Sequence, residues 1–215
     1  MKKDIKAIKS ELISKIEHGI KKSWSEAQEM FGEIEDILVK NKLIDAEYLI
    51  TVNIAQSLKA LNLYLGSPYQ ILLEHPTKEF ATNCTPLILK NKPYTFNTTS
   101  QIRSGTYDSN KRSGKIDIAI YDNCTPAYGQ LPLCAIEVKG FNPSKSSIIK
   151  DLERNLSFFE ITSNTGNSTL PLAAFATIKL YFNSAKQNKR VNNLNKVKTL
   201  YESYLTALAI PASIE

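Results

Sequence analysis

Two short apolar segments carry charged residues at positions where a β-strand normally buries its side chains. Segment 115–120 reads KIDIAI and contains Asp117, and segment 133–140 reads LCAIEVKG and contains Glu137 and Lys139. Aliphatic and β-branched runs bounded by Gly, Pro and Asn are typical of buried strands. Because an ionised carboxylate in such a run is costly unless it is paired or binds a metal ion, these segments predict a site rather than plain core.

The spacing predicts how these side chains meet. Side chains alternate across a strand, so Glu137 and Lys139 share a face about 7 Å apart. A hairpin pairing of the two segments would bring Asp117 beside Glu137. Two acids and one lysine on one sheet face suit hydrolysis assisted by a divalent metal ion.

Asp117 followed by Glu137-Val138-Lys139 resembles the signature of the PD-(D/E)xK nuclease superfamily, which has the restriction-endonuclease-like fold. Ile116 stands where the family name has Pro. The resemblance implies an αβββαβ core and Mg²⁺-dependent phosphodiester hydrolysis, with Mn²⁺ able to substitute. Asp117, Glu137 and the Val138 carbonyl oxygen would hold the ion. Lys139 would orient or deprotonate the attacking water or stabilise transition-state charge, its pKa lowered by partial burial and opposed by the acids.

Two further acids are candidates for the same site. Glu74 ends the first expected core strand, where members of the superfamily commonly add an acid to the metal site; the alternative is a solvated charge at a strand end. Glu47 lies in the first turn of the expected core helix, where some members place another acid. The helix dipole alone also favours a glutamate there.

The elements that must position these residues follow the order of the resembled core. Apolar periodicity and turn residues predict helix 45–65, strands 69–74, 115–122 and 133–139, helix 147–160 and strand 171–182. A short strand is expected at 86–90 and a loop over 97–113. The fold class is therefore α/β, a central mixed sheet flanked by helices.

The ends of the chain read as helical. A basic amphipathic helix is expected over 4–21, followed by a second helix that Ser23 or Ser25 would cap. A final helix is expected over 191–208. We therefore expect an N-terminal helical extension over 1–43 and a nuclease-like domain over 44–215 with a C-terminal helix.

Charge favours a polyanionic partner, because the chain carries a formal net charge of +6. Basic residues lead into Asp117 and recur on the helix after Lys139. The nucleic-acid-binding candidates are Arg103, Lys111, Arg112, Lys115, Lys150 and Arg154. For Lys150 and Arg154 a solvated helix face, beside Asp151 and Glu153, remains an equal alternative.

The remaining features limit the class of protein. No stretch has the length of a membrane span, and the charged N-terminus lacks the apolar core of a signal peptide. Three cysteines and two histidines do not form a zinc pattern, so reduced thiols and a cytoplasmic location are expected.

The prediction is a Mg²⁺-dependent nuclease, with DNA as the expected substrate and an endonuclease of restriction, phage-defence or repair type as the expected kind. A homodimer is an option, because nuclease domains that cut both strands often pair. The alternatives are an inactive nuclease-fold module that binds nucleic acid or protein, and a different enzyme in which Glu-x-Lys is accidental.

Overall fold

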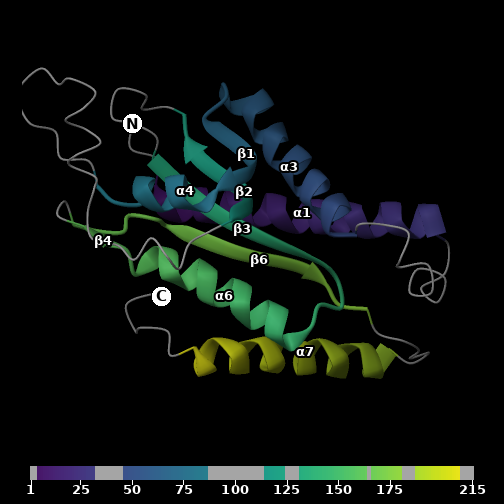
Figure 1. The fold of residues 1–215 in the computed structure, drawn as a ribbon. Helices are drawn as coiled ribbons and strands as arrows, with labels where there is room; N and C mark the ends of the chain where they lie inside the picture. Colours follow the sequence, from purple (N-terminus) through teal and green to yellow (C-terminus); the bar gives the residue numbers. More distant parts are fainter. Residues whose placement is uncertain are drawn as a thin grey trace, which may run out of the picture.

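The computed structural model describes residues 4–31, 46–86, 114–123, 131–163, 166–180 and 187–208. Within these residues the chain forms a four-stranded mixed sheet with helices on both faces (Figure 1). The helices are α1 (Ile5–Phe31), α3 (Ala46–Leu65), α4 (Thr77–Asn83), α6 (Lys145–Phe159) and α7 (Gln187–Ala207). The strands are β1 (Tyr69–Pro76), β2 (Lys115–Asp122), β3 (Leu131–Phe141), β4 (Thr162–Ser163), β5 (Gly166–Asn167) and β6 (Leu172–Ile178).

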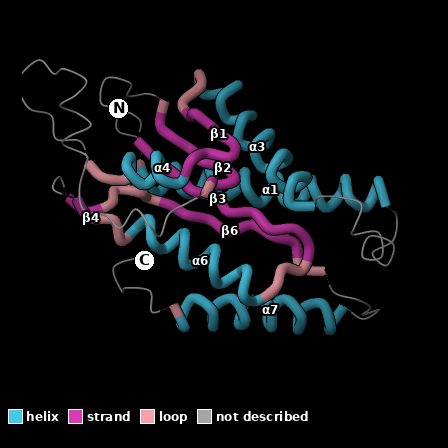
Figure 2. The backbone as a smooth tube through the Cα atoms, viewed as in Figure 1, coloured by secondary structure: helices cyan, strands magenta, loops and turns pink. Residues whose placement is uncertain are grey.

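The main sheet has the order β1-β2-β3-β6 (Figure 2). Strands β1, β2 and β3 are antiparallel neighbours, and β6 is parallel to β3. A parallel pair needs a crossover connection, and α6 lies within the one that joins β3 to β6. The mixed α/β class is therefore confirmed, and the order α3-β1-β2-β3-α6-β6 is compatible with the αβββαβ expectation, with α4 added between β1 and β2.

Helices α1 and α3 cover one face of the sheet. The apolar side of α3, including Ile50, Ile54 and Leu58, packs on Ile118 and Ile136 of the central strands. Helix α1 adds Leu12 and Ile16 to the same buried cluster. The two helices cross closely at Gly19, where an added Cβ would lie 2.5 Å from the Ile54 Cα.

The expected break between two N-terminal helices is wrong. Helix α1 continues without interruption from Ile5 to Phe31, so Ser23 and Ser25 lie inside it. Their hydroxyls donate to the carbonyl oxygens of Gly19 and Lys21, four residues earlier, instead of capping a new helix. Packing against α3 carries the helix through a sequence whose local pattern allowed a restart. The expected domain boundary at 43/44 falls outside the described residues.

Helices α4 and α6 cover the other face of the sheet. Phe80 of α4 makes edge-to-face contacts with Tyr121 of β2 and with Phe158 of α6. The Tyr121 hydroxyl lies 2.8 Å from His75 Nε2. The Phe80, Tyr121 and Phe158 rings belong to the buried apolar cluster on this face.

Several elements differ in extent from the sequence-based expectation. Strand β1 runs through Pro76 instead of ending before His75, α4 was not expected, and β6 is confined to Leu172–Ile178. The strand expected at 86–90 lies outside the described residues except for Pro86, and the loop expected over 97–113 lies wholly outside them. Among the helices of the described part, none is long and apolar enough to cross a membrane.

Candidate functional site

Asp117 and Glu137 lie opposite each other on neighbouring strands. Ile118 pairs with Ile136 and Ala119 with Ala135, so the same register sets Asp117 against Glu137. The Asp117 carboxylate reaches across to β3, where its Oδ2 atom accepts a hydrogen bond of 2.6 Å from the Val138 backbone N–H. The two acids of the sequence motif are therefore brought together by the central strand pair.

Glu74 extends this row onto a third strand. The pairs Leu73 with Ile118 and His75 with Ile116 place Glu74 opposite Asp117. Glu74 has a left-handed backbone conformation, with φ of 50°, and its side chain is 61% exposed. Its carboxylate lies 3.7 Å from Lys115 Nζ, so it stands at the rim of the site rather than inside it.

Lys139 is held between two helices. Its Nζ atom lies 3.3 Å from Glu47 Oε1 on α3 and 3.4 Å from Asp151 Oδ2 on α6. It also donates a hydrogen bond of 3.0 Å to the Val138 carbonyl oxygen, the atom expected to be a metal ligand. The structure thus brings Glu47 to the site through Lys139.

Gly140 shows how near the first turn of α3 comes to β3. A Cβ added at Gly140 would lie 3.4 Å from both the Ala46 Cβ and the Glu47 backbone nitrogen. That separation is close van der Waals contact, so β3 and the first turn of α3 lie almost against each other beside the Glu47–Lys139 ion pair.

Glu137 is almost completely buried, at 1% exposure, and its partner is Arg154 of α6. The Arg154 Nε atom donates to Glu137 Oε1 at 3.1 Å, and Nη2 forms an ion pair with the same oxygen. Nη2 also donates to the Lys115 carbonyl oxygen at 3.0 Å. Arg154 therefore points into the site, which decides against the solvated-face alternative for this residue.

Asp151 is the site residue that sequence reasoning missed. The sequence pattern places it only as a neighbour in the solvated-face alternative for Lys150 and Arg154, but it is buried and faces Lys139. Its Oδ1 atom lies 4.0 Å from Arg154 Nη1, one helical turn away. The available signal was the spacing of Asp151 and Arg154, three residues apart and hence on one face of a helix.

Burial controls the protonation of the two motif acids. It raises the pKa of Glu137 to about 7, although the hydrogen bond from Arg154 and its charge act in the opposite direction. It also raises the pKa of Asp117, against the hydrogen bond from Val138 and the charge of Lys139. For Lys139, burial lowers the pKa, but Asp151 and Glu47 outweigh it and the net shift is upward.

Of the other nucleic-acid-binding candidates, the structure describes Lys115 and Lys150. Lys115 lies beside Glu74 with a side chain that is 60% exposed, and Lys150 is exposed on α6. Arg103, Lys111 and Arg112 lie outside the described residues. Of this set, Arg154 and Lys115 adjoin the motif acids.

We call the assembled residues the charged cluster. Its members are Glu47, Glu74, Lys115, Asp117, Glu137, Lys139, Asp151 and Arg154. With every group ionised, five carboxylates face three cations, a formal excess of two negative charges. The buried Asp151 Oδ2 atom also accepts no hydrogen bond from the described residues.

This donor set fits a hard divalent cation in chemistry and in charge. Mg²⁺ takes oxygen ligands, and the excess of two negative charges is what such an ion would balance. Within the described parts of the chain, however, no three His, Cys, Asp or Glu side chains converge as a ready metal cluster. A cation at Glu137 would compete with the Arg154 guanidinium, which already neutralises that carboxylate.

No family model, curated protein or solved structure matches this chain. The geometry of the charged cluster is therefore the basis for a functional proposal. Paired acids on adjacent strands, with a protonated lysine held beside them, can bind a cation and stabilise negative charge on an anionic substrate.

Proposed function

We propose that this protein is a Mg²⁺-dependent nuclease of the PD-(D/E)xK kind that hydrolyses phosphodiester bonds, with DNA as the expected substrate. The observation that carries the proposal is the register of β2 and β3, which sets Asp117 opposite Glu137 with Lys139 two residues further along. Lys139 and Glu137 both reach α6, so they share one face of the sheet.

Asp117 and Glu137 would hold the ion, and Glu74 stands at the rim where it could add a water-mediated contact. When bound, Mg²⁺ supplies Lewis acidity and lowers the pKa of water. Lys139 keeps its proton because its pKa is raised, which suits orientation of water and stabilisation of phosphate charge better than proton abstraction. Glu47 and Asp151 are positioning residues that hold the Lys139 ammonium from two sides.

The alternative function, a nuclease fold without catalysis, has one observation in its favour. Arg154 already pairs with the buried Glu137, so that acid is neutralised without a metal ion. In an inactive binding module this pair would be permanent. In a nuclease the cation would exchange with the guanidinium, which would become available to a substrate phosphate.

A cleavage assay tests the proposal directly. The protein would be incubated with supercoiled plasmid, linear duplex and single strands, with Mg²⁺, Mn²⁺ or EDTA. Asp117→Asn should reduce cleavage by about 10³-fold or more, roughly 4 kcal/mol of transition-state stabilisation. The matched control is Asp122→Asn, at the other end of β2, which should cleave like the parent. Cleavage by Asp117→Asn at the parent rate would remove the site assignment.

Calorimetric titration of Mn²⁺ separates binding from catalysis. Asp117→Asn should weaken binding greatly because an oxygen ligand loses its charge. Lys139→Ala should retain or strengthen binding, since a nearby positive charge opposes the cation. Mn²⁺ binding without cleavage of any substrate would support the non-catalytic alternative, and equal weakening by both substitutions would contradict the role given to Lys139.

A further inference from the structure

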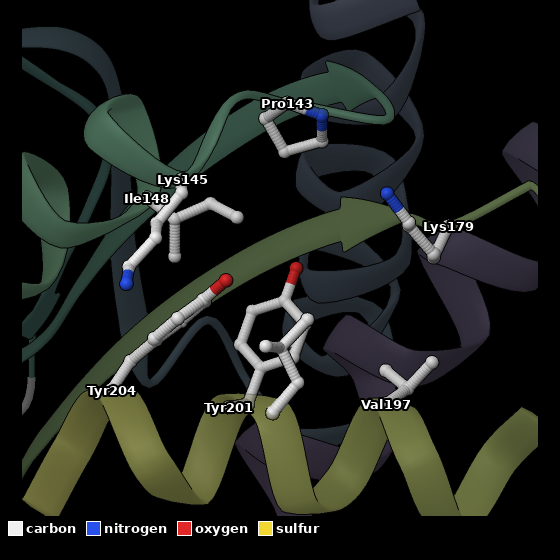
Figure 3. A pocket seen from close by; sticks show the side chains of 8 residues that line it. Pro143, Lys145, Ile148, Lys179, Val197, Tyr201 and Tyr204 are labelled. Carbon is white, nitrogen blue, oxygen red and sulfur yellow. The ribbon is translucent and has the colours of Figure 1, made fainter.

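A hollow of about 110 Å³ lies between the start of α6, the end of β6 and α7. The Tyr201 and Tyr204 rings rise from α7, and their hydroxyl groups point toward the middle of the hollow (Figure 3). The Lys145 and Lys179 side chains stand on opposite sides of it (Figure 3). Ile148 of α6 contributes to its apolar wall.

The polar groups of this hollow share one chemical property. Each lysine ammonium carries three hydrogen-bond donors and no acceptor, and each tyrosine hydroxyl can donate. No Asp or Glu is among the described residues that line it. The Lys145 Nζ atom lies 5.3 Å from the centre of the Tyr204 ring, a cation–π contact that holds the ammonium at the edge of the hollow. Two positive charges and converging donors favour a small oxyanion.

The position of the hollow relates it to the charged cluster. Lys145 and Ile148 lie in the first turn of α6, where the helix dipole favours negative charge. The same helix carries Asp151 and Arg154 into the charged cluster. With a rise of 1.5 Å per residue, Ile148 and Arg154 are separated by about 9 Å along the axis. One strand of duplex DNA carries a phosphate about every 3.4 Å of helix axis, so about 9 Å corresponds to a few nucleotides.

We propose that this hollow binds a backbone phosphate of a nucleic-acid strand, a few nucleotides from the bond placed at the charged cluster. The inference rests on the proposed function for the identity of the strand. The phosphate would lie between Lys145 and Lys179 and accept hydrogen bonds from the tyrosine hydroxyls. Such contacts fix the register of a strand without reading its sequence.

The test compares two double variants of the full chain. One is Lys145→Ala with Lys179→Ala, which removes both charges of the hollow. The control is Lys6→Ala with Lys59→Ala, which removes two exposed lysines, one on α1 and one on α3, neither of which lines the hollow. Binding of a fluorescently labelled duplex oligonucleotide would be measured by anisotropy in EDTA over a salt series.

We expect the hollow variant to bind more weakly and to flatten the slope of log affinity against log salt by about one to two units. The control pair should change that slope by less than about half a unit. Equal losses in the two variants would show that only total charge matters and would overturn the proposal. Thermal unfolding of both variants checks that the difference does not come from a loss of structure.

A smaller change addresses the hydroxyl groups. Tyr204→Phe keeps the ring and its contact with Lys145 but removes one donor. Oligonucleotide affinity should fall by roughly three- to tenfold. Affinity equal to that of the parent would contradict a phosphate seated among the hydroxyls.

Inorganic phosphate distinguishes the source of the anion. Its binding would be followed by the NMR signals of the tyrosine rings in the parent and in the Lys145/Lys179 variant. Binding of free phosphate in the hollow, with no effect of the variant on oligonucleotides, would overturn the assignment to a strand. Loss of strand binding in the Lys145/Lys179 variant supports the inference even if no cleavage is found. If that variant binds oligonucleotides like the parent while Asp117→Asn does not cleave, the phosphate assignment is overturned and the nuclease proposal still stands.

Discussion

The two faces of the central strands β2 and β3 are built from alternating residues of these strands, and the two faces have different roles. Toward α1 and α3, β2 and β3 present an unbroken apolar surface that includes Ile118, Ile120 and Ile136. Toward α4 and α6 the same strands carry Ala119, Tyr121 and Ala135 at one end of the sheet and the charged cluster at the other. One face is uniform along its length, and the other changes from core to site within a few residues.

The difference shows how a sheet can hold charges that its interior would otherwise exclude. Burying an apolar side chain stabilises the fold without a partner, so the α1/α3 face needs only shape and volume. Each buried charge on the α6 face needs a partner from another element, as Glu137 needs Arg154 and Lys139 needs Asp151. The apolar face is therefore stabilised by burial alone, whereas the charged face depends on pairing between elements.

The largest effect is expected where a buried charge loses its partner. Arg154→Met should lower the free energy of unfolding by about 3–5 kcal/mol at pH 8, because Glu137 would remain buried and uncompensated. Lys115→Met is the matched control, since the Lys115–Glu74 pair has both side chains about 60% exposed and should change stability by less than about 1 kcal/mol. Urea unfolding measures both, and equal effects would mean that burial does not distinguish the two pairs.

On the apolar face the expected loss of stability depends on the side-chain volume that is removed and is insensitive to pH. Ile136→Ala removes a fully buried side chain and should reduce the free energy of unfolding by about 2–4 kcal/mol, from lost burial and from the cavity left behind. Leu73→Ala, at a side chain that is 46% exposed on β1, should have a much smaller effect. A loss at Ile136 that varied strongly between pH 5 and pH 8 would show that the two faces are coupled.

A pH series should show the smallest of these effects. Glu137 has a pKa of about 7 in the folded protein against an ordinary value of 4.5, so the folded state binds more protons between these limits. Stability should therefore fall by up to about 3 kcal/mol as the pH rises from 4.5 to above 7. Glu137→Gln should flatten that part of the curve. An unchanged slope in the variant would assign the pH dependence to other groups.

The sequence predicted the strands that carry the motif because their signal is local. Alternation and flanking turn residues were enough for 115–122, which matches β2 in full, and for the shared face of Glu137 and Lys139. The partners of Lys139 were harder to predict from the sequence. Glu47 and Asp151 are close to Lys139 only because α3 and α6 pack at the same end of β3, and helix packing is not encoded in either helix alone.

The wrong prediction of a break within α1 and the failure to predict α4 have the same origin. Ser23 and Ser25 resemble capping residues in a short window, but the contacts of α1 with α3 favour one continuous helix. Helix α4 follows His75-Pro76, a sequence that reads as a turn, and it is helical because Phe80 and Ala81 are buried against the sheet. In each case a tertiary contact decided between local options of similar energy.

In the described part of the chain, each of the two apolar clusters beside the sheet contains one buried cysteine. Cys134 belongs to the cluster under α1 and α3, Cys84 belongs to the cluster under α4 and α6, and both thiols are inaccessible to solvent. Burial raises the pKa of the Cys134 thiol, and alkylating reagents react with the exposed thiolate. Each cysteine therefore becomes reactive only when its own layer separates from the sheet. Timed alkylation, with the modified peptides separated by mass spectrometry, would measure the opening rate of each layer independently.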